Sequence, residues 1–460
     1  MNSFLLNRQL GAISPEAFKS AHSNRLLQSF QAAENITFAL EAPTPIHKVT
    51  DTVQLQPGSA KSVAHAAGVN SIAIDRFEGR YLLSGGADSS LAIWDLDADV
   101  LDSSDTTHLP LAHIARSSSG QSLGITHVAF YPFDSLAFLT SSYDHTLKLY
   151  SSETFAVSAT FDLGSVVYSH SSSNVGSSLL VACASQHPAV RLVDLRSGSS
   201  THSLAGHSGA VLTVAWHPKD ENLLASGATD GCVRLWDIRR SASSLGVLDM
   251  EDSIGIAGYD GKGTGARRRE RGKSHNGAVN GITWTEDGGY LVSVGHDERM
   301  RVWNMTAGAN TLANFGPALK NAHTTTLLPL IAPSGLSPPG RETVYFLNPK
   351  EVLSFDLHSG SLLSRLRAPG IAANVGLDAS VRNLKNRTTS LAWRAHNIEM
   401  YSAHADGTIR CWSPRTWEDA VVDQDEKPES EAAEAVDRKR KRDELDQIVR
   451  DLTKKPVTFT

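Results

Sequence analysis

The sequence predicts an all-β protein, a seven-bladed β-propeller with an N-terminal helix-loop-helix and a flexible C-terminal tail. Three observations along the 460 residues predict this fold. A histidine lies 22 or 23 residues before three aspartates, at His65, His207 and His275. Between each histidine and its aspartate lies a short apolar stretch that ends in small residues, as in Leu223 to Gly227. An aspartate also precedes a tryptophan or tyrosine by six positions at five places: Asp88 to Trp94, Asp144 to Tyr150, Asp230 to Trp236, Asp297 to Trp303 and Asp406 to Trp412.

Each repeated unit is expected to hold four strands. After the turn aspartate the residues alternate, as in Cys232 to Trp236, which suits a strand with one buried face. One such unit cannot bury both of its faces alone, so the units should stack around a ring. Two weaker units lie at 190–195 and 351–356, where His187 and Pro349 replace the aspartate. The terminal bulky residues of the seven units are Trp94, Tyr150, Val193, Trp236, Trp303, Phe355 and Trp412.

Composition restricts the function classes. There are 43 Lys and Arg against 49 Asp and Glu, a net charge of −6, so the chain as a whole has no electrostatic attraction to nucleic acid or anionic membranes. No apolar run approaches the length of a membrane span and no signal peptide is recognisable, so we expect an intracellular protein with no membrane partner. Three cysteines, Cys183, Cys232 and Cys411, are too few and too far apart for a disulfide framework or a cysteine zinc site.

Residues 1–40 are expected to lie outside the blades as two short helices. Their apolar residues recur at nearly helical spacing, and Ser14-Pro15 resembles an N-cap followed by proline at the first helical position. A helix pair this apolar should pack on the propeller or on a partner, and a leader that packs only locally is the alternative.

The propeller is expected over residues 41–417. Its last unit has no outer strand after Trp412, so we expect the segment 48–64, with Val49, Val53, Leu55 and Val63, to close the ring and remove an exposed strand edge. A glycine- and arginine-rich insertion at 245–274 and a second long segment at 96–122 are expected to be loops.

The histidines and aspartates of the repeat are interpreted as structural, because a buried aspartate that accepts hydrogen bonds from a histidine and turn amides is satisfied. The expected structural residues are His207, Asp230, Trp236, His275, Asp297 and Trp303. No nucleophile elbow is present, and the glycine-rich run 261–265 lacks the strand and spacing of a phosphate loop. We therefore expect no catalytic residue, no metal and no cofactor, and binding is the remaining function.

One face of the ring is the candidate binding surface. Residues just before each turn aspartate and at the start of each inner strand should emerge together at the mouth of the channel. The expected client-binding residues are Tyr143, His145, Gln186, Trp216, Thr229 and His296.

The charged tail, 418–460, is acidic at first and then carries a basic cluster. That cluster favours nuclear import or, alternatively, a nucleic-acid contact. Its residues are Arg438, Lys439, Arg440, Lys441 and Arg442.

The repeat resembles the WD-repeat propellers, and further stretches resemble the Cockayne syndrome group A family over about residues 1–415. The more specific stretches are the leader and Val167-Tyr168-Ser169-His170. Others are Phe4-Leu5, Arg8-Gln9, Pro15, Arg25, 78–86, Tyr131-Pro132, Asp144 with 146–148, 275–277 and 279–281.

The resemblance implies a non-catalytic substrate receptor of a cullin-4 RING ubiquitin ligase in transcription-coupled nucleotide excision repair. It implies an adaptor, DNA damage-binding protein 1, and clients at the opposite face, the Cockayne syndrome group B protein and stalled RNA polymerase II. The implied adaptor-binding residues are Phe4, Leu5, Arg8, Gln9 and Arg25 in the leader and Trp236, Asp237 and Arg239 in a Trp-Asp-x-Arg box. The box is weaker at Val193-Asp194-Leu195-Arg196.

Two other functions stay open from the sequence. A nuclear WD-repeat scaffold, or a histone- or chromatin-binding propeller, would also explain a basic tail. A direct nucleic-acid binder would use 267–271 and 438–442, but we do not expect this to be the main activity.

Overall fold

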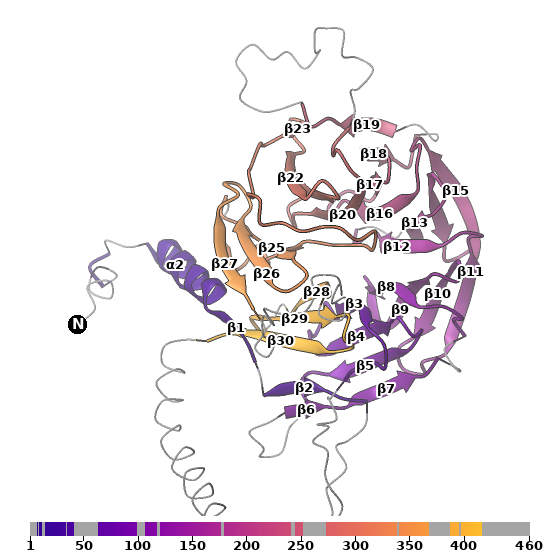
Figure 1. The fold of residues 1–460 in the computed structure, drawn as a ribbon, viewed down its shortest axis with the longest axis horizontal. Coiled ribbons are helices and arrows are strands. Elements are labelled where there is room, and N and C mark those ends of the chain that lie inside the picture. The colour runs from indigo at the N-terminus through magenta and orange to yellow at the C-terminus, as the bar shows by residue number, and fades with distance from the viewer. Residues whose placement is uncertain are drawn as a thin grey trace, which may run out of the picture. The chain divides into compact units, whose positions relative to one another are not determined.

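The computed structural model describes residues 7, 9–11, 14–33, 35–40, 63–98, 106–116, 120–175, 179–240, 244–251, 273–337, 340–367, 387–394 and 397–415. The chain divides into two compact units, Met1–Ser413 and Pro414–Thr460. Over the described residues, the first unit is a seven-bladed β-propeller of four-stranded sheets arranged in a ring (Figure 1). The predicted fold class is confirmed.

The blades follow one another in chain order, and in blades 1 to 6 the inner strand comes first. Blades 1 to 3 are β3 (Val69–Ile74), β4 (Tyr81–Gly86), β5 (Leu91–Asp95) and β7 (Pro110–Ile114); β8 (Ile125–Tyr131), β9 (Asp134–Ser142), β10 (Thr146–Ser151) and β11 (Val157–Asp162); and β12 (Val167–Ser172), β13 (Leu180–Ser185), β14 (Ala189–Asp194) and β15 (Ser199–Ala205). Blades 4 to 6 are β16 (Val211–Trp216), β17 (Leu223–Ala228), β18 (Val233–Asp237) and β19 (Ser244–Leu248); β20 (Val279–Trp284), β21 (Tyr290–Gly295), β22 (Arg299–Asn304) and β23 (Ala309–Asn310); and β24 (Leu330–Ile331), β25 (Thr343–Leu347), β26 (Val352–Asp356) and β27 (Leu362–Leu366).

Blade 7 joins two distant parts of the chain. Its three inner strands are β28 (Thr388–Arg394), β29 (Glu399–His404) and β30 (Ile409–Pro414), and its outer strand is β1 (Phe30–Ala32). The expected closing strand at 48–64 was therefore wrong, as was the expectation that residues 1–40 lie outside every blade. Residues 48–62 lie outside the described residues.

Aromatic packing explains why β1 closes the ring. The Phe30 side chain is buried, with its ring centroid 5.5 Å from that of Trp393 and 6.3 Å from that of Tyr345, both in edge-on geometry. Leu27, at the end of the preceding helix, joins the same core cluster. Burial of an aromatic ring in such a pocket contributes a few kcal/mol, which outweighs the small number of hydrogen bonds in a three-residue strand.

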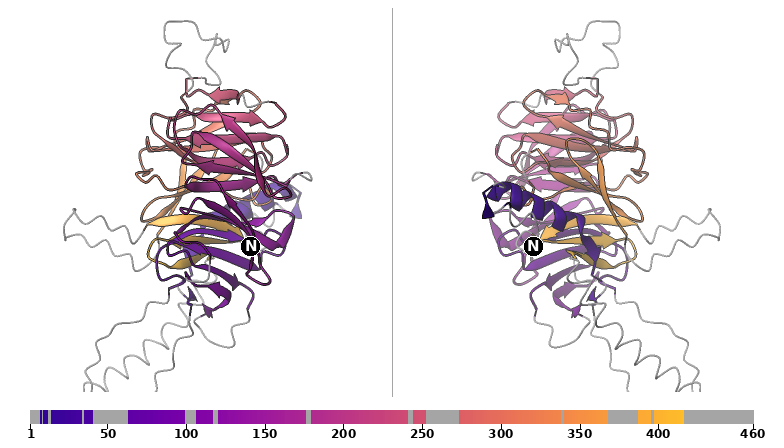
Figure 2. Two further views of the ribbon diagram at one scale, coloured as in Figure 1. Left: turned by 90° about the vertical axis from the view of Figure 1, so that its right-hand side faces the viewer. Right: turned by 90° about the vertical axis from the view of Figure 1, so that its left-hand side faces the viewer.

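The helix α2 (Pro15–Gln28) precedes β1 and begins at Pro15, as predicted. Figure 2 shows it against the side of the ring, beside the strands of blades 6 and 7. Of its described side chains, only Ser23 and Leu27 are buried, and the others are half-buried or exposed. The helix is therefore joined to the ring through its last turn.

Two segments expected to be loops contain strands. The segment 96–122 supplies β7, the outer strand of blade 1, and β6 (Thr106–His108), which pairs in parallel with β2 (Ile36–Phe38). The expected insertion at 245–274 begins inside β19, the outer strand of blade 4. Both strands are short and only part of their residues is buried, so they lack the apolar run that marks the more central strands in the sequence.

Candidate binding surfaces

Blades 4 and 5 each hold a buried chain of hydrogen bonds from a histidine to a tryptophan. In blade 4, His207 Nδ1 lies 3.0 Å from Asp230 Oδ2 and His207 Nε2 lies 2.8 Å from Ser226 Oγ. The Trp236 indole donates to the same Ser226 Oγ at 2.7 Å. Because a carboxylate only accepts, His207 donates from Nδ1, and the serine hydroxyl then donates to Nε2.

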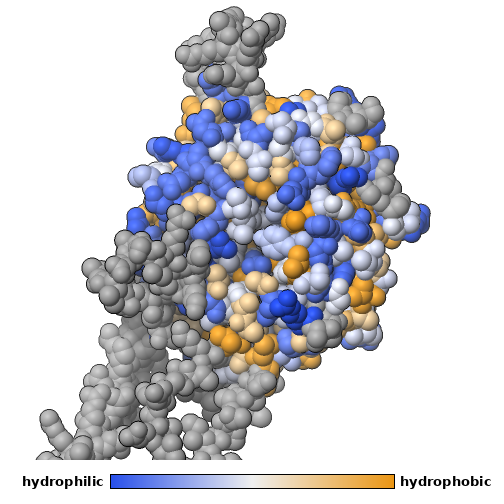
Figure 3. All heavy atoms as spheres, turned by 45° about the vertical axis from the view of Figure 1, so that its right-hand side comes forward, coloured by the Kyte–Doolittle hydropathy of each residue, from blue (hydrophilic) through white to orange (hydrophobic). Residues whose placement is uncertain are grey.

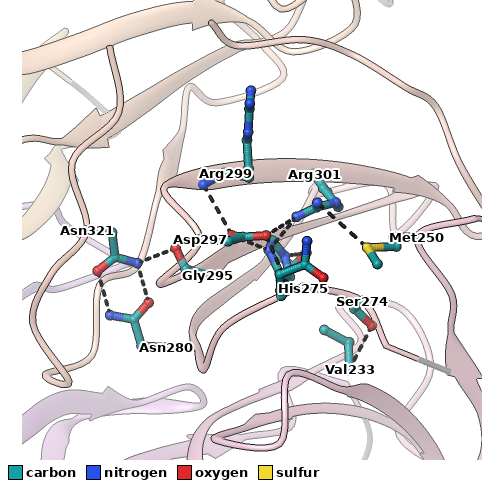
Figure 4. Close-up of polar contacts among 12 residues, drawn as sticks. Val233, Met250, Ser274, His275, Asn280, Gly295, Asp297, Arg299, Arg301 and Asn321 are labelled. Atoms are coloured by element: carbon teal, nitrogen blue, oxygen red, sulfur yellow. Dashed lines mark hydrogen bonds and ion pairs between the residues drawn. The ribbon is translucent and has the colours of Figure 1, made fainter. Parts of the chain in front are cut away.

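Blade 5 repeats the chain and extends it by one arginine. His275 lies 2.9 Å from Asp297 Oδ1 and 2.8 Å from Ser293 Oγ, and the Trp303 indole donates to Ser293 at 2.9 Å. Arg301 donates to Asp297 Oδ2 at 2.8 Å, as Figure 4 shows beside His275. The carboxylate is therefore held from two sides.

These chains are structural in their chemistry. Burial raises the pKa of Asp230, but hydrogen bonds from His207 and from the amides of Ser208 and Cys232 outweigh it and hold the pKa well below its usual value. The side chains of His207 and His275 have no exposed surface, so no substrate could reach them. Their carboxylates stay ionised and paired, which leaves no free acid or base.

The centre of each chain is the residue that links the histidine to the indole. It lies in the second strand of each blade, two residues after the partner of the terminal bulky residue. The residues at this hub position in blades 1 to 7 are Ser84, Thr140, Cys183, Ser226, Ser293, Phe346 and Ser402. The hydroxyl is replaced in blades 3 and 6, the two units that also lack the turn aspartate.

The inner strands carry a second feature that the sequence did not reveal. In six of the described inner strands the register shifts at the second residue, which marks a β-bulge. The bulge residues are Asn70, Thr126, Tyr168, Leu212, Asn280 and Thr389. Three of these side chains bond to the start of the next blade's inner strand: Asn70 to Ile125 O at 2.7 Å, Thr126 to Val167 O at 2.7 Å and Thr389 to Val69 O at 2.6 Å.

Five of the six expected client-binding residues lie at one end of the ring. Tyr143, His145, Gln186, Thr229 and His296 sit in the turns between the second and third strands. His145, Gln186 and Thr229 are exposed, whereas His296 is half-buried and its Nε2 lies 2.8 Å from His323 O.

The placement of Trp216 with these residues was wrong. The register of β16 pairs Val211 with Ala228, beside Thr229, and pairs Trp216 with Leu224 at the other end. Trp216 is 6% exposed, and its indole donates to Ser171 O at 2.9 Å. A six-residue strand separates the two faces of the ring, so its first and last residues cannot share a surface.

The Trp-Asp-x-Arg box of blade 4 lies at the end of the ring opposite Thr229. Trp236 and Asp237 are buried, and Arg239 is exposed. Arg239 forms two hydrogen bonds with Asp237, Nε to Oδ1 at 3.0 Å and a terminal nitrogen to Oδ2 at 2.8 Å, and this pairing lowers the pKa of Asp237 to about 2. A partner at this face would meet Arg239 directly, while Asp237 holds the arginine and Trp236 anchors the strand to Ser226 in the blade interior.

Other expected site residues are only partly described. Gln9 and Arg25 are exposed, whereas Phe4, Leu5, Arg8 and the basic cluster 438–442 lie outside the described residues. On the face drawn in Figure 3, hydrophilic side chains predominate and hydrophobic ones form small separate groups. A partner of that face would rely mainly on polar contacts.

Comparison with known proteins agrees with the blade structure. The model of the WD domain, G-beta repeat, matches residues 59–95, 113–151, 198–237 and 269–304. In their described parts these matches contain the first three strands of blades 1, 2, 4 and 5, and two of them also include residues of the preceding blade's outer strand. The chain therefore contains WD repeats, and no catalytic family is indicated. No helix in the described part of the chain is long and apolar enough to cross a membrane.

Three relatives illustrate the range of similarity. The Arabidopsis thaliana "WD repeat-containing protein ATCSA-1" is 29% identical over 79% of this chain and 89% of its own length. The Neurospora crassa "Ribosome biogenesis protein ytm1" is 27% identical over 54% of this chain and 55% of its own. The Saccharomyces cerevisiae "Radiation-sensitive protein 28" is 27% identical over 41% of this chain and 39% of its own.

Proposed function

We propose that the chain is the non-catalytic substrate receptor of a cullin-4 RING ubiquitin ligase in the nucleus. It would bind the adaptor DNA damage-binding protein 1 and serve transcription-coupled nucleotide excision repair. Its clients would be the Cockayne syndrome group B protein and stalled RNA polymerase II. The observation that carries the proposal is Arg239, an exposed arginine held by the buried carboxylate of Asp237 at the end of the ring opposite the turn residues.

The rigidity of Arg239 supports its role as a contact residue. Its fork is held by both oxygens of Asp237, which is itself fixed in β18. A preorganised arginine loses less conformational freedom on binding than a mobile one. The similarity to ATCSA-1 also spans most of both chains, and the name of Radiation-sensitive protein 28 agrees with a role in repair.

Two opposite faces suit a receptor that acts by proximity. With the adaptor at the Arg239 face and a client at the channel mouth, the ring would hold the client's lysines near the ubiquitin-carrying enzyme. Linking two binding events in this way raises the effective concentration of the target without any active site on the receptor.

The test is affinity for purified adaptor, with mass spectrometry of what co-purifies. Arg239→Ala is expected to weaken adaptor binding at least tenfold, as removal of an anchoring arginine does. Deletion of residues 1–13, with Arg25→Ala, should weaken it further. The deletion must stop before α2, because Leu27 and Phe30 belong to the core.

Arg80→Ala is the matched control. Arg80 pairs with Asp95, the blade 1 counterpart of Asp237, with nitrogen–oxygen distances of 2.9 and 2.6 Å. Its loss should leave adaptor binding unchanged. If the wild type binds neither adaptor nor cullin, or if the two alanine variants lose affinity equally, the proposal is wrong.

The alternative is a nuclear WD-repeat scaffold or a histone- or chromatin-binding propeller. The similarity to ribosome biogenesis protein ytm1, over about half of each chain, favours a scaffold of some kind. The same purification separates the two functions, because a scaffold would keep its partners in the leader deletion.

A further inference from the structure

The mouth of the central channel holds a small polar cavity at the end of the ring that carries the turn residues. Its wall includes the bulge residues Asn70, Thr126 and Tyr168, from blades 1, 2 and 3. Two more residues line the cavity: Tyr143, from a turn of blade 2, and Arg387, immediately before β28.

A segment between blades 5 and 6 crosses the channel and forms another wall of this cavity. Thr326, which precedes blade 6, donates to Tyr168 O in blade 3 at 3.2 Å. Figure 1 shows the chain reaching from the side of β25 toward β12. The Asn280 amide anchors the segment, with bonds of 3.0 Å to His323 O and 2.8 Å to Thr325 O.

The backbone of β20 lies directly against the segment that crosses the channel. At Gly281 a side chain of even one carbon would collide with Leu327 O, so the strand and the crossing segment touch through backbone. The cavity is therefore a preformed feature of the ring, built from bonded elements on several sides.

Arg387 is the only charged residue among those that line the cavity. Its side chain is half-buried, and within the described residues its guanidinium has no hydrogen bond or ion pair. Burial lowers the pKa of Arg387, although the guanidinium stays charged at neutral pH. A partly desolvated cation without a partner is costly, and an anion that enters the cavity would relieve that cost.

The two tyrosines add neutral donors beside this charge. Neither the Tyr143 nor the Tyr168 hydroxyl has a hydrogen-bond partner in the described part of the chain. Burial raises the pKa of both, so each keeps its proton at neutral pH. The cavity thus offers a fork of N–H groups and two O–H groups, and none of the described residues that line it is anionic.

We propose that the channel mouth is a binding site for a single acidic side chain of a protein partner, held by Arg387 between Tyr143 and Tyr168. The cavity volume of about 20 Å³ is little more than the space that one water molecule needs, so a single small group can enter it but a whole nucleotide or sugar cannot. A planar carboxylate also matches the guanidinium fork. The site lies on the face opposite Arg239 and does not depend on adaptor binding.

The test is selection of random peptides on the full-length protein, followed by a double-mutant cycle. Selected peptides are expected to share an aspartate or glutamate at one position. Changing that residue to its amide, or Arg387→Gln in the protein, should each weaken binding at least about tenfold. The two changes together should cost little more than either alone, because they remove the same contact.

Arg299→Gln is the matched control, since Arg299 is an exposed arginine at the start of β22 on the same face and points away from the polar chain in Figure 4. It should leave peptide affinity unchanged. Arg387→Lys, which keeps the charge and loses the fork, should retain part of the affinity, and thermal melting checks that each variant is folded.

Any of four results would overturn the proposal, three from the selection and the variants and one from a modified peptide. The first three are the absence of an enriched acidic position, equal losses in Arg387→Gln and Arg299→Gln, and additive losses in the cycle. Tighter binding when phosphoserine replaces the acidic residue would also overturn it, because the assignment is to a carboxylate.

Discussion

Blades 4 and 3 occupy neighbouring places in one ring yet fill their interiors differently. Blade 4 places Ser226 at the hub and bonds it to His207 and Trp236. Blade 3 places Cys183 there and ends its third strand with Val193, so the interior is packed without such a chain. Blade 6 resembles blade 3, with Phe346 at the hub.

The difference teaches what the repeat motif contributes. The ring requires that each interior be filled, and both apolar side chains and a satisfied polar chain meet that requirement. The polar chain also fixes orientation, because its hydrogen bonds hold the indole and the turn in one position relative to each other. It also makes a blade sensitive to the loss of any one partner.

The largest expected effect is acid sensitivity, which separates blades that contain a buried histidine with a lowered pKa from blade 6. Burial lowers the pKa of His65 in blade 1 and of His127 in blade 2 to about 4. The unfolded chain takes up protons on both residues below about pH 6.5, whereas the folded chain does not. The free energy of unfolding should therefore fall as the pH falls from about 6.5 to about 4, with no further loss from these two residues below that.

Hydrogen exchange at pH 7 and pH 5, corrected for intrinsic rates, checks this by blade. Protection of β4 and β9 should fall before that of β25 and β26, because the described part of blade 6 contains no buried histidine. Equal loss of protection in all blades would mean that the buried histidines do not set local acid sensitivity.

The next largest effect on the free energy of unfolding is expected from two serine substitutions. Ser226→Ala leaves His207 Nε2 and the Trp236 indole unpaired in the interior, and should lower the free energy of unfolding by about 2 kcal/mol. Ser185→Ala in blade 3 should be neutral or slightly stabilising, because the Ser185 hydroxyl is buried with no partner in the described structure. Urea denaturation measures both, and equal losses would contradict the distinction between the blades.

The same contrast explains how far the sequence could predict the molecule. The seven units could be found because Asp230, Trp236 and their counterparts recur at fixed spacing, and each contact lies within one unit. The start of α2 at Pro15 is also local information.

Features that depend on distant segments could not be predicted. Phe30 closes the ring because Tyr345 and Trp393 form its pocket, more than 300 residues later in the chain. Arg387 faces Tyr143 only because blades 7 and 2 meet at the channel. Nothing in the local pattern of these residues reports such contacts.

The smallest expected effect tests whether the turn aspartate stabilises a blade without the rest of the hydrogen-bond chain. His187→Asp restores the missing turn aspartate of blade 3, at an exposed position. We expect the free energy of unfolding to change by no more than about 0.5 kcal/mol, because no histidine chain is present to use the carboxylate. Asp230→Ala, the reverse change in blade 4, should cost about 2 kcal/mol, since it removes the acceptor of His207 and of two amides. If His187→Asp stabilised blade 3 as much as Asp230→Ala destabilised blade 4, the aspartate would act through its own turn, and the buried chain would not be the cooperative unit.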